Sequence, residues 1–170
     1  MGETEPRVTV LDAGPVIHLD QLGCLDLLEG LGSLYLPATV EQEVRRHRPA
    51  ISFGANVELH RAPDPEAVPA SLAAIARNLD LHAGETAALV LLEQMDGDLF
   101  LCDDAAARFA AESLGYEVHG TIGLLLRAIR RGKRSAEQVR AILRELPERS
   151  SLHISRALLD EIIAQISSAH

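Results

Sequence analysis

Acidic side chains stand at four points of this chain where they could work together on a metal ion. Asp12 and the adjacent pair Asp103 and Asp104 each end an apolar run typical of a buried strand, whereas Glu43 and Glu85 fall on segments with helical patterns. The carboxyl ends of parallel strands meet at one edge of a sheet, which is where ligands bind in open α/β folds. The spacing therefore predicts that these acids converge on that edge.

Carboxylates that lie close together repel one another, so a cluster of them must be stabilised by another group. Two of them about 4 Å apart repel by about 4 kcal/mol at an effective dielectric constant of 20. A hard divalent cation removes that penalty, and a ligand set made only of oxygen favours Mg²⁺ or Mn²⁺ over zinc.

Each acid also has an ordinary structural interpretation. Asp12 suits a turn before Gly14 and Pro15, Glu43 a solvated helix face, Glu85 the first turn of a helix, and Asp104 an N-cap. These interpretations explain each acid separately better than they explain all of them together. Asp12, Glu85 and the 103–104 pair adjoin strongly apolar runs, where an uncompensated charge is costly.

Strands and helices alternate along the chain. Strands are expected at 7–11, 33–36, 57–61, 98–103 and 116–119, and helices from about 16, then at 39–46, 71–78, 84–95, 105–113, 121–130, 135–145 and 155–167. Such alternation indicates a mainly parallel sheet with helices on both faces.

Composition limits the functional classes. The chain has 170 residues, 47% of them apolar and 24% charged, which indicates one soluble globular domain. No apolar stretch approaches the roughly twenty residues of a membrane span, and the acidic N-terminus lacks a signal core, so a cytoplasmic protein without membrane association is expected. Cys24 and Cys102 are too far apart in sequence for a zinc knuckle or a redox motif and are expected to be buried thiols.

A net charge of −9 argues against general coating of nucleic acid. Two basic clusters could still hold an RNA backbone, or could merely complement helix dipoles. Their residues are Arg45, Arg46, Arg127, Arg130, Arg131, Lys133 and Arg134.

Other reaction classes lack their motifs. The chain contains no GxxxxGK[ST] loop, no GxSxG elbow and no HExxH pair. A dehalogenase-type phosphatase needs a second Asp where Gly14 stands, and a receiver domain needs a Lys where 119–121 read His-Gly-Thr.

The order of motifs resembles the PIN-domain family, and within it the toxin–antitoxin-associated branch of predicted nucleic-acid-binding proteins. The resemblance covers nearly the whole chain except 48–70. It rests on 10–17 (VLDAGPVI), 36–44 (LPATVEQEV), 84–89 (GETAAL), 101–108 (LCDDAAAR) and 120–126 (GTIGLLL), followed by the helix at Ile154–Ser155.

This resemblance implies a three-layer α/β/α fold, with residues 1–170 as a single PIN-like domain and 135–170 as a C-terminal helical extension packed on it. It also implies a Mg²⁺- or Mn²⁺-dependent ribonuclease with a metal-activated water. By position, the catalytic acids are Asp12, Glu43, Glu85 and Asp104, and the metal ligands are Asp12, Glu85, Asp103 and Asp104. Departures from the family pattern are Ala13, where many relatives carry a hydroxyl, and Glu85, where Asp is more usual.

The partners implied are an RNA substrate, a small antitoxin protein and, by analogy with relatives, a second copy in a homodimer. Thr121 is expected either to place a hydroxyl near the acids or to cap the helix that follows Gly120. The main rival interpretation is a degenerate member that keeps the fold as a binding module for nucleic acid or protein.

Overall fold

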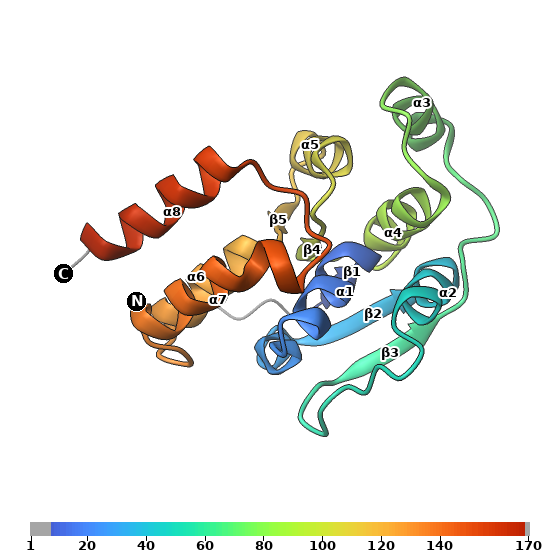
Figure 1. The fold of residues 1–170 in the computed structure, drawn as a ribbon. Coiled ribbons are helices and arrows are strands. Elements are labelled where there is room, and N and C mark those ends of the chain that lie inside the picture. Colours follow the sequence, from blue (N-terminus) through green and yellow to red (C-terminus); the bar gives the residue numbers. More distant parts are fainter. Residues whose placement is uncertain (1–7, 169–170) are drawn as a thin grey trace.

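The protein is a three-layer α/β/α domain around a parallel sheet, seen in a computed structural model that describes residues 8–168 (Figure 1). The five strands are β1 (Val8–Leu11), β2 (Ser33–Pro37), β3 (Leu59–Ala62), β4 (Leu99–Leu101) and β5 (Glu117–His119). They lie in the order β3-β2-β1-β4-β5, and every pairing is parallel. This architecture confirms the fold class expected from the alternating pattern.

Helices connect the strands and cover both faces of the sheet. They are α1 (Ala13–Gln21), the 3-10 helix η1 (Leu25–Leu28), α2 (Ala38–His47), α3 (Ala70–Asn78), α4 (Ala83–Gln94), α5 (Ala105–Ser113), α6 (Thr121–Arg130), α7 (Ala136–Arg149) and α8 (Arg156–Ser168). In the described part of the chain, no helix has the length and apolar character needed to span a bilayer.

Side chains of the central strands alternate between two separate cores. Leu11, Leu99 and Leu101 pack with α1, η1, α6 and α7 on one face. Val10, Phe100 and Cys102 pack with α4 and α5 on the other. Successive residues of a strand point to opposite faces, so neighbours at a strand end separate in the same way. This alternation decides where each acid at the end of β1 and β4 is directed.

Two elements near the expected site differ from their predicted bounds. Helix α1 begins at Ala13 and not near Val16, which makes Asp12 its N-cap residue. Pro15 is then the third helical residue, where a missing N–H costs no intrahelical hydrogen bond. Strand β4 ends at Leu101, so Asp103, which was expected to end the strand, lies with Asp104 in the turn to α5.

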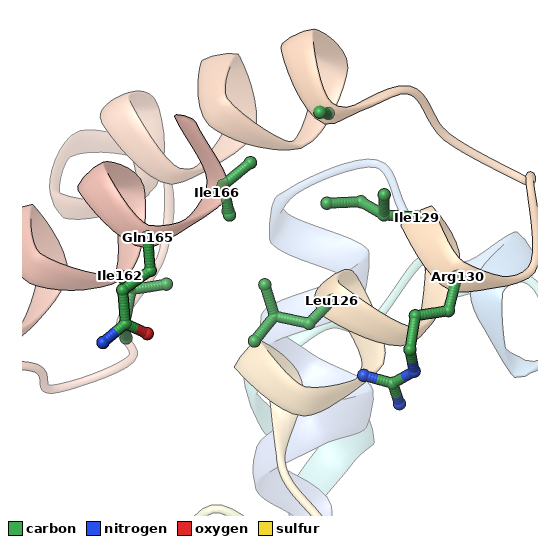
Figure 2. A pocket seen from close by; sticks show the side chains of 7 residues that line it. Leu126, Ile129, Arg130, Ile162, Gln165 and Ile166 are labelled. Atoms are coloured by element: carbon green, nitrogen blue, oxygen red, sulfur yellow. The ribbon is translucent and has the colours of Figure 1, made fainter. Parts of the chain in front are cut away.

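The last two helices, α7 and α8, pack on the face of the sheet that α1 and α6 cover. Val139, Leu143 and Leu146 of α7 and Leu159 of α8 are buried in the same core as the sheet. Helix α7 extends through Pro147 to Arg149, beyond the predicted end at 145, and Leu146 in its last turns is fully buried. A hollow of about 280 Å³ remains where Leu126 and Ile129 of α6 face Ile162 and Ile166 of α8 (Figure 2).

Candidate active site

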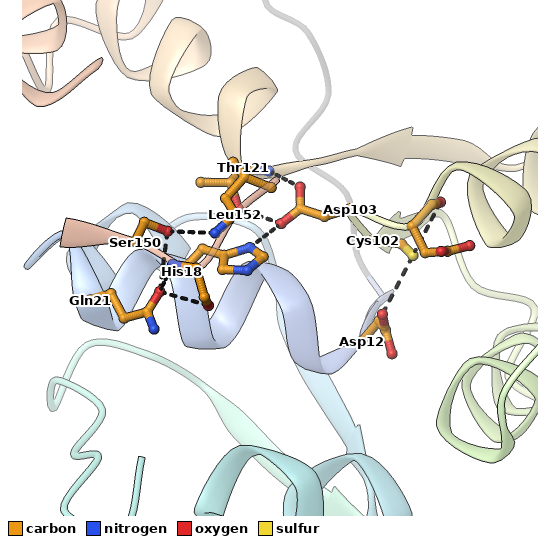
Figure 3. Close-up of polar contacts among 10 residues, drawn as sticks. Asp12, His18, Gln21, Cys102, Asp103, Thr121, Ser150 and Leu152 are labelled. Carbon is orange, nitrogen blue, oxygen red and sulfur yellow. Dashed lines mark hydrogen bonds and ion pairs between the residues drawn. The ribbon is translucent and has the colours of Figure 1, made fainter. Parts of the chain in front are cut away.

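Asp12 is a buried carboxylate at the carboxyl edge of the sheet. Its backbone N–H donates to Leu101 O at 2.9 Å, which continues the β1–β4 pairing by one residue and sets Asp12 beside Cys102. The Cys102 thiol lies 3.5 Å from Oδ2 of Asp12 (Figure 3). Only 7% of Asp12 is exposed, so its charge is poorly solvated.

Electrostatics link Asp12 to two other predicted acids. Burial raises the pKa of Asp12 from 3.8 to about 7, although the backbone N–H of Ala13 acts in the opposite direction. The charges of Glu85 and Glu43 raise this pKa further. Burial and the neighbouring Asp12 carboxylate also raise the pKa of the Cys102 thiol, which therefore stays protonated and can donate to Asp12. Glu85 and Glu43 are therefore near enough to this sheet edge for their charges to act on Asp12.

Gly84 allows the start of α4 to approach α2 at Glu43. It lies in the first turn of α4, where a Cβ would be 3.4 Å from Val40 and 3.6 Å from Oε2 of Glu43 on α2. The missing side chain allows the two helices to approach closely. Glu85 follows directly, is 9% exposed, and accepts a hydrogen bond through Oε2 from His82 N at 2.8 Å.

Helix N-termini surround the same edge. Asp12 is the N-cap of α1, Glu85 is the third residue of α4, and Asp104 is the N-cap of α5. Positive ends of helix dipoles favour anionic groups, whether carboxylates or the phosphates of a bound ligand. Glu43 differs, because it lies within α2 and is exposed.

The adjacent acids Asp103 and Asp104 have different environments. Asp103 faces the α1–α6 layer, where Oδ1 accepts from Thr121 N at 2.7 Å and Oδ2 accepts from the Thr121 hydroxyl at 2.6 Å. Its Oδ2 also lies 2.7 Å from Nδ1 of His18 (Figure 3). Both oxygens of Asp103 thus already bind protein donors. Asp103 also lies on the opposite side of the sheet from Cys102, which packs with α4 and α5.

Asp104 is the N-cap of α5, as its ordinary structural interpretation supposed. Its Oδ1 accepts from Ala107 N at 2.9 Å, and Oδ2 has no hydrogen-bond or ion-pair partner among residues 8–168. The residue is exposed at the same sheet edge. Capping therefore uses one oxygen and leaves the other open to a ligand.

Thr121 was a residue with two alternative predicted roles. Its N-cap role is wrong, because Gly120 is the N-cap of α6 and Thr121 is the first helical residue. The fully buried hydroxyl is instead directed to Asp103. His18, which the sequence pattern did not single out, is the third member of this cluster. No local pattern marked it, because its partner Asp103 lies 85 residues away in the sequence.

The basic cluster at the end of α6 lies away from the acids. Helix α6 starts beside the carboxyl end of β5 and is about 15 Å long, so its last turn lies toward the opposite edge of the sheet. There the Lys133 Nζ donates to Glu29 O at 2.7 Å, and Arg134 forms two hydrogen bonds of 2.8 Å to Asp26. Arg127 is buried, while Arg130 and Arg131 are exposed at that end.

The other predicted cations are closer to the site. Arg45 and Arg46 lie in the last turn of α2, within one turn of Glu43. Arg45 pairs with Glu41 at 2.9 Å, and Arg46 is exposed without a partner among the described residues. Of the seven predicted cations, Arg46 is therefore the one best placed to reach a phosphate at the acids.

Comparison with known families agrees with this arrangement. Residues 8–168 match the family DUF3368, described as a PIN domain. The chain belongs to the PIN-domain family. PIN domains are generally nucleases and typically use divalent metals. A search of curated proteins found no match to this PIN domain.

Proposed function

We propose that this PIN domain is a metal-dependent ribonuclease that hydrolyses RNA phosphodiesters with a metal-activated water. One observation carries the proposal: Asp12 is buried within electrostatic range of Glu85 and Glu43, and its pKa is raised to about 7. Buried neighbouring carboxylates ionise with difficulty unless a cation is bound near them. Strongly shifted pKa values of this kind are more typical of functional sites than of structural ones.

The donor set fits a hard divalent ion. Asp12, Glu43 and Glu85 offer only carboxylate oxygens, and Oδ2 of Asp104 is open at the same edge, which suits Mg²⁺ or Mn²⁺. When bound, such an ion lowers the pKa of a coordinated water and neutralises charge that develops on the phosphate. Asp12 and Glu85 would hold it from the buried side, while the exposed Glu43 and Asp104 would complete the site and orient the water.

Asp103 is less suited to the ligand role that the family pattern allowed. Its two oxygens already accept three hydrogen bonds from Thr121 and His18. We infer that it fixes the turn from which Asp104 projects. The further role as the toxin of a toxin–antitoxin pair rests on the motif resemblance and would require a small antitoxin protein as partner.

A second candidate function is a binding module without turnover. It is favoured by one observation: among the described residues, no group of three His, Cys, Asp or Glu side chains is already gathered as a metal site. Under this alternative the acids would remain apart when a divalent ion is added.

A cleavage assay separates the two candidates. The purified protein is incubated with a labelled single-stranded RNA in Mg²⁺, in Mn²⁺ and in chelator, together with Asp12→Asn and with Glu148→Gln as an exposed acid-to-amide control on α7. We expect metal-dependent cleavage that falls by at least about a hundredfold in Asp12→Asn and is unchanged in Glu148→Gln. RNA binding without cleavage in any metal would instead support the binding module.

A further inference from the structure

A cleft opens beside Asp103, on the side of the sheet edge away from Glu85. Its volume is about 360 Å³, within the range of roughly 300–1,000 Å³ typical of ligand pockets. It lies between α5, α6, the segment 150–155 and α8, and its walls include Arg108, Ile122, Leu152, His153, Ile154 and Leu158. The cleft therefore adjoins the proposed catalytic acids without being part of their cluster.

Arg108 supplies an uncommitted positive charge to this cleft. Its Nη1 lies 2.9 Å from where a Cβ of Gly120 would be, so the guanidinium packs over that glycine. It has no hydrogen-bond or ion-pair partner within residues 8–168. Asp103 is close by, but its carboxylate is already bound by Thr121 and His18. A partly buried guanidinium without an acidic partner is suited to bind a phosphate.

The position of Arg108 relates it to the proposed scissile bond. Its backbone N–H donates to Asp104 O at 3.0 Å, so Arg108 lies one turn into α5 from the N-cap residue Asp104. Four residues of helix rise about 6 Å along the axis, so Arg108 lies close to Asp104 at the start of α5. A phosphate on Arg108 would then be next to one held at Asp104.

The rest of the cleft offers a surface for a base. Ile122, Ile154 and Leu158 are apolar, and His153 adds an aromatic ring. The segment that carries His153 is anchored to α1, because Oε1 of Gln21 accepts hydrogen bonds from the Ser150 hydroxyl and from Ser151 N (Figure 3). This wall is thus held in place before any ligand binds.

We propose that the cleft binds one nucleotide of the RNA next to the scissile bond, with its phosphate on Arg108 and its base against His153 and Leu158. This inference rests on the proposed function and names the part of the protein that holds the substrate. It commits to single-stranded RNA, because only an unpaired base can enter a cleft of this size.

Binding measurements without turnover test the inference. Anisotropy of a fluorescein-labelled decauridylate is measured in chelator between about 50 and 200 mM salt. The variants are Arg108→Gln and Leu158→Ser, chosen because neither side chain is fully buried; Leu158 is 49% exposed. Their matched controls are Arg77→Gln, exposed on α3, and Leu114→Ser, 42% exposed at the end of α5.

Arg108→Gln should raise the Kd about tenfold and reduce the slope of log K against log salt by about 0.7. Leu158→Ser should raise the Kd about threefold without changing that slope, because it removes only apolar contact. Both controls should bind like the wild type.

Equal binding by Arg108→Gln and the wild type would overturn the inference, as would an equal loss in Arg77→Gln, which would indicate charge alone. These outcomes are distinguishable from failure of the proposed function. If the protein cleaves RNA but Arg108→Gln binds RNA normally, the cleft proposal is rejected and the ribonuclease proposal stands. If Arg108→Gln weakens binding but no cleavage occurs in Mg²⁺ or Mn²⁺, the ribonuclease proposal is rejected and the cleft proposal stands.

Discussion

The hydroxyl of Thr121 donates to Oδ2 of Asp103 at 2.6 Å, across eighteen residues of sequence. The backbone N–H of Thr121 binds the other oxygen of the same carboxylate at 2.7 Å. This relationship joins the start of α6 to the turn after β4. It assigns to Asp103 a different task from that of its neighbour Asp104.

Asp103→Asn and Asp104→Asn should therefore separate stability from activity. In Asp103→Asn an amide NH₂ replaces a carboxylate oxygen that accepts hydrogen bonds from Thr121 or His18. One of these hydrogen bonds is then lost, so the free energy of unfolding should fall by about 1–3 kcal/mol. Asp104→Asn should stay within about 0.5 kcal/mol of the wild type, because asparagine also caps helices, yet lose most cleavage. Urea unfolding and RNA cleavage of both variants provide the measurement. A stable, inactive Asp103→Asn beside an active Asp104→Asn would show that Asp103 holds the metal.

Divalent ions should stabilise the protein through Asp12. At a hundredfold excess over its dissociation constant, a ligand of the folded state adds about 2.7 kcal/mol. For a chain of this length that corresponds to a rise in Tm of about 5–10 °C. Asp12→Asn should remove most of the rise, while Glu148→Gln keeps it. Melting curves that do not move from zero to millimolar Mg²⁺ or Mn²⁺ would count against the metal site.

Without metal, stability should depend on pH through the same side chain. The pKa of Asp12 is raised from 3.8 to about 7, chiefly by burial and further by Glu85 and Glu43. Between these values the folded state keeps a proton that the unfolded state has lost, so the free energy of unfolding falls as pH rises.

The loss is complete above about pH 7 and amounts to at most about 4 kcal/mol. In chelator, Asp12→Asn should therefore gain stability relative to the wild type from pH 4 to pH 8. Thermal melts of both proteins across this range check the prediction. Parallel curves would indicate that Asp12 ionises normally in the folded protein.

Gly120 should tolerate no side chain. A Cβ there would lie 2.6 Å from Oδ1 of Asp103 and 2.9 Å from Nη1 of Arg108. Gly120→Ala should cost about 1–3 kcal/mol through overpacking and should weaken RNA binding by displacing the guanidinium. Gly54→Ala is the control, since its nearest neighbour would be 3.6 Å away. Equal stability of the two variants in urea would contradict this packing.

Several features were readable from local sequence patterns. Apolar runs and breakers located the strands and the helices, because these signals act over a few residues. Asp12 and Asp104 could be assigned to helix starts or strand ends from their immediate neighbours. The sheet edge to which these acids belong followed from the parallel arrangement of the strands.

Helix boundaries near Asp12 were harder to predict. Pro15 suggested a helix beginning near Val16, because proline favours the first helical position. Proline is also tolerated at the third helical position, because the first four N–H groups of a helix make no intrahelical hydrogen bond. The sequence pattern therefore could not distinguish the two starts. Packing of Ala13 and Val16 against the sheet selected the earlier one.

By itself the sequence determined which acids stand at the ends of elements and that a parallel sheet would gather them. Only the tertiary structure decided their partners: Asp103 turns to Thr121 and His18, and Glu43 lies against Gly84, the residue before Glu85. It also decided that the segment carrying His153 lies against α1 and forms a cleft with Arg108. The physical reason is that these contacts join segments from about twenty to more than a hundred residues apart, and their geometry depends on side-chain packing between layers, which no short-range periodicity encodes.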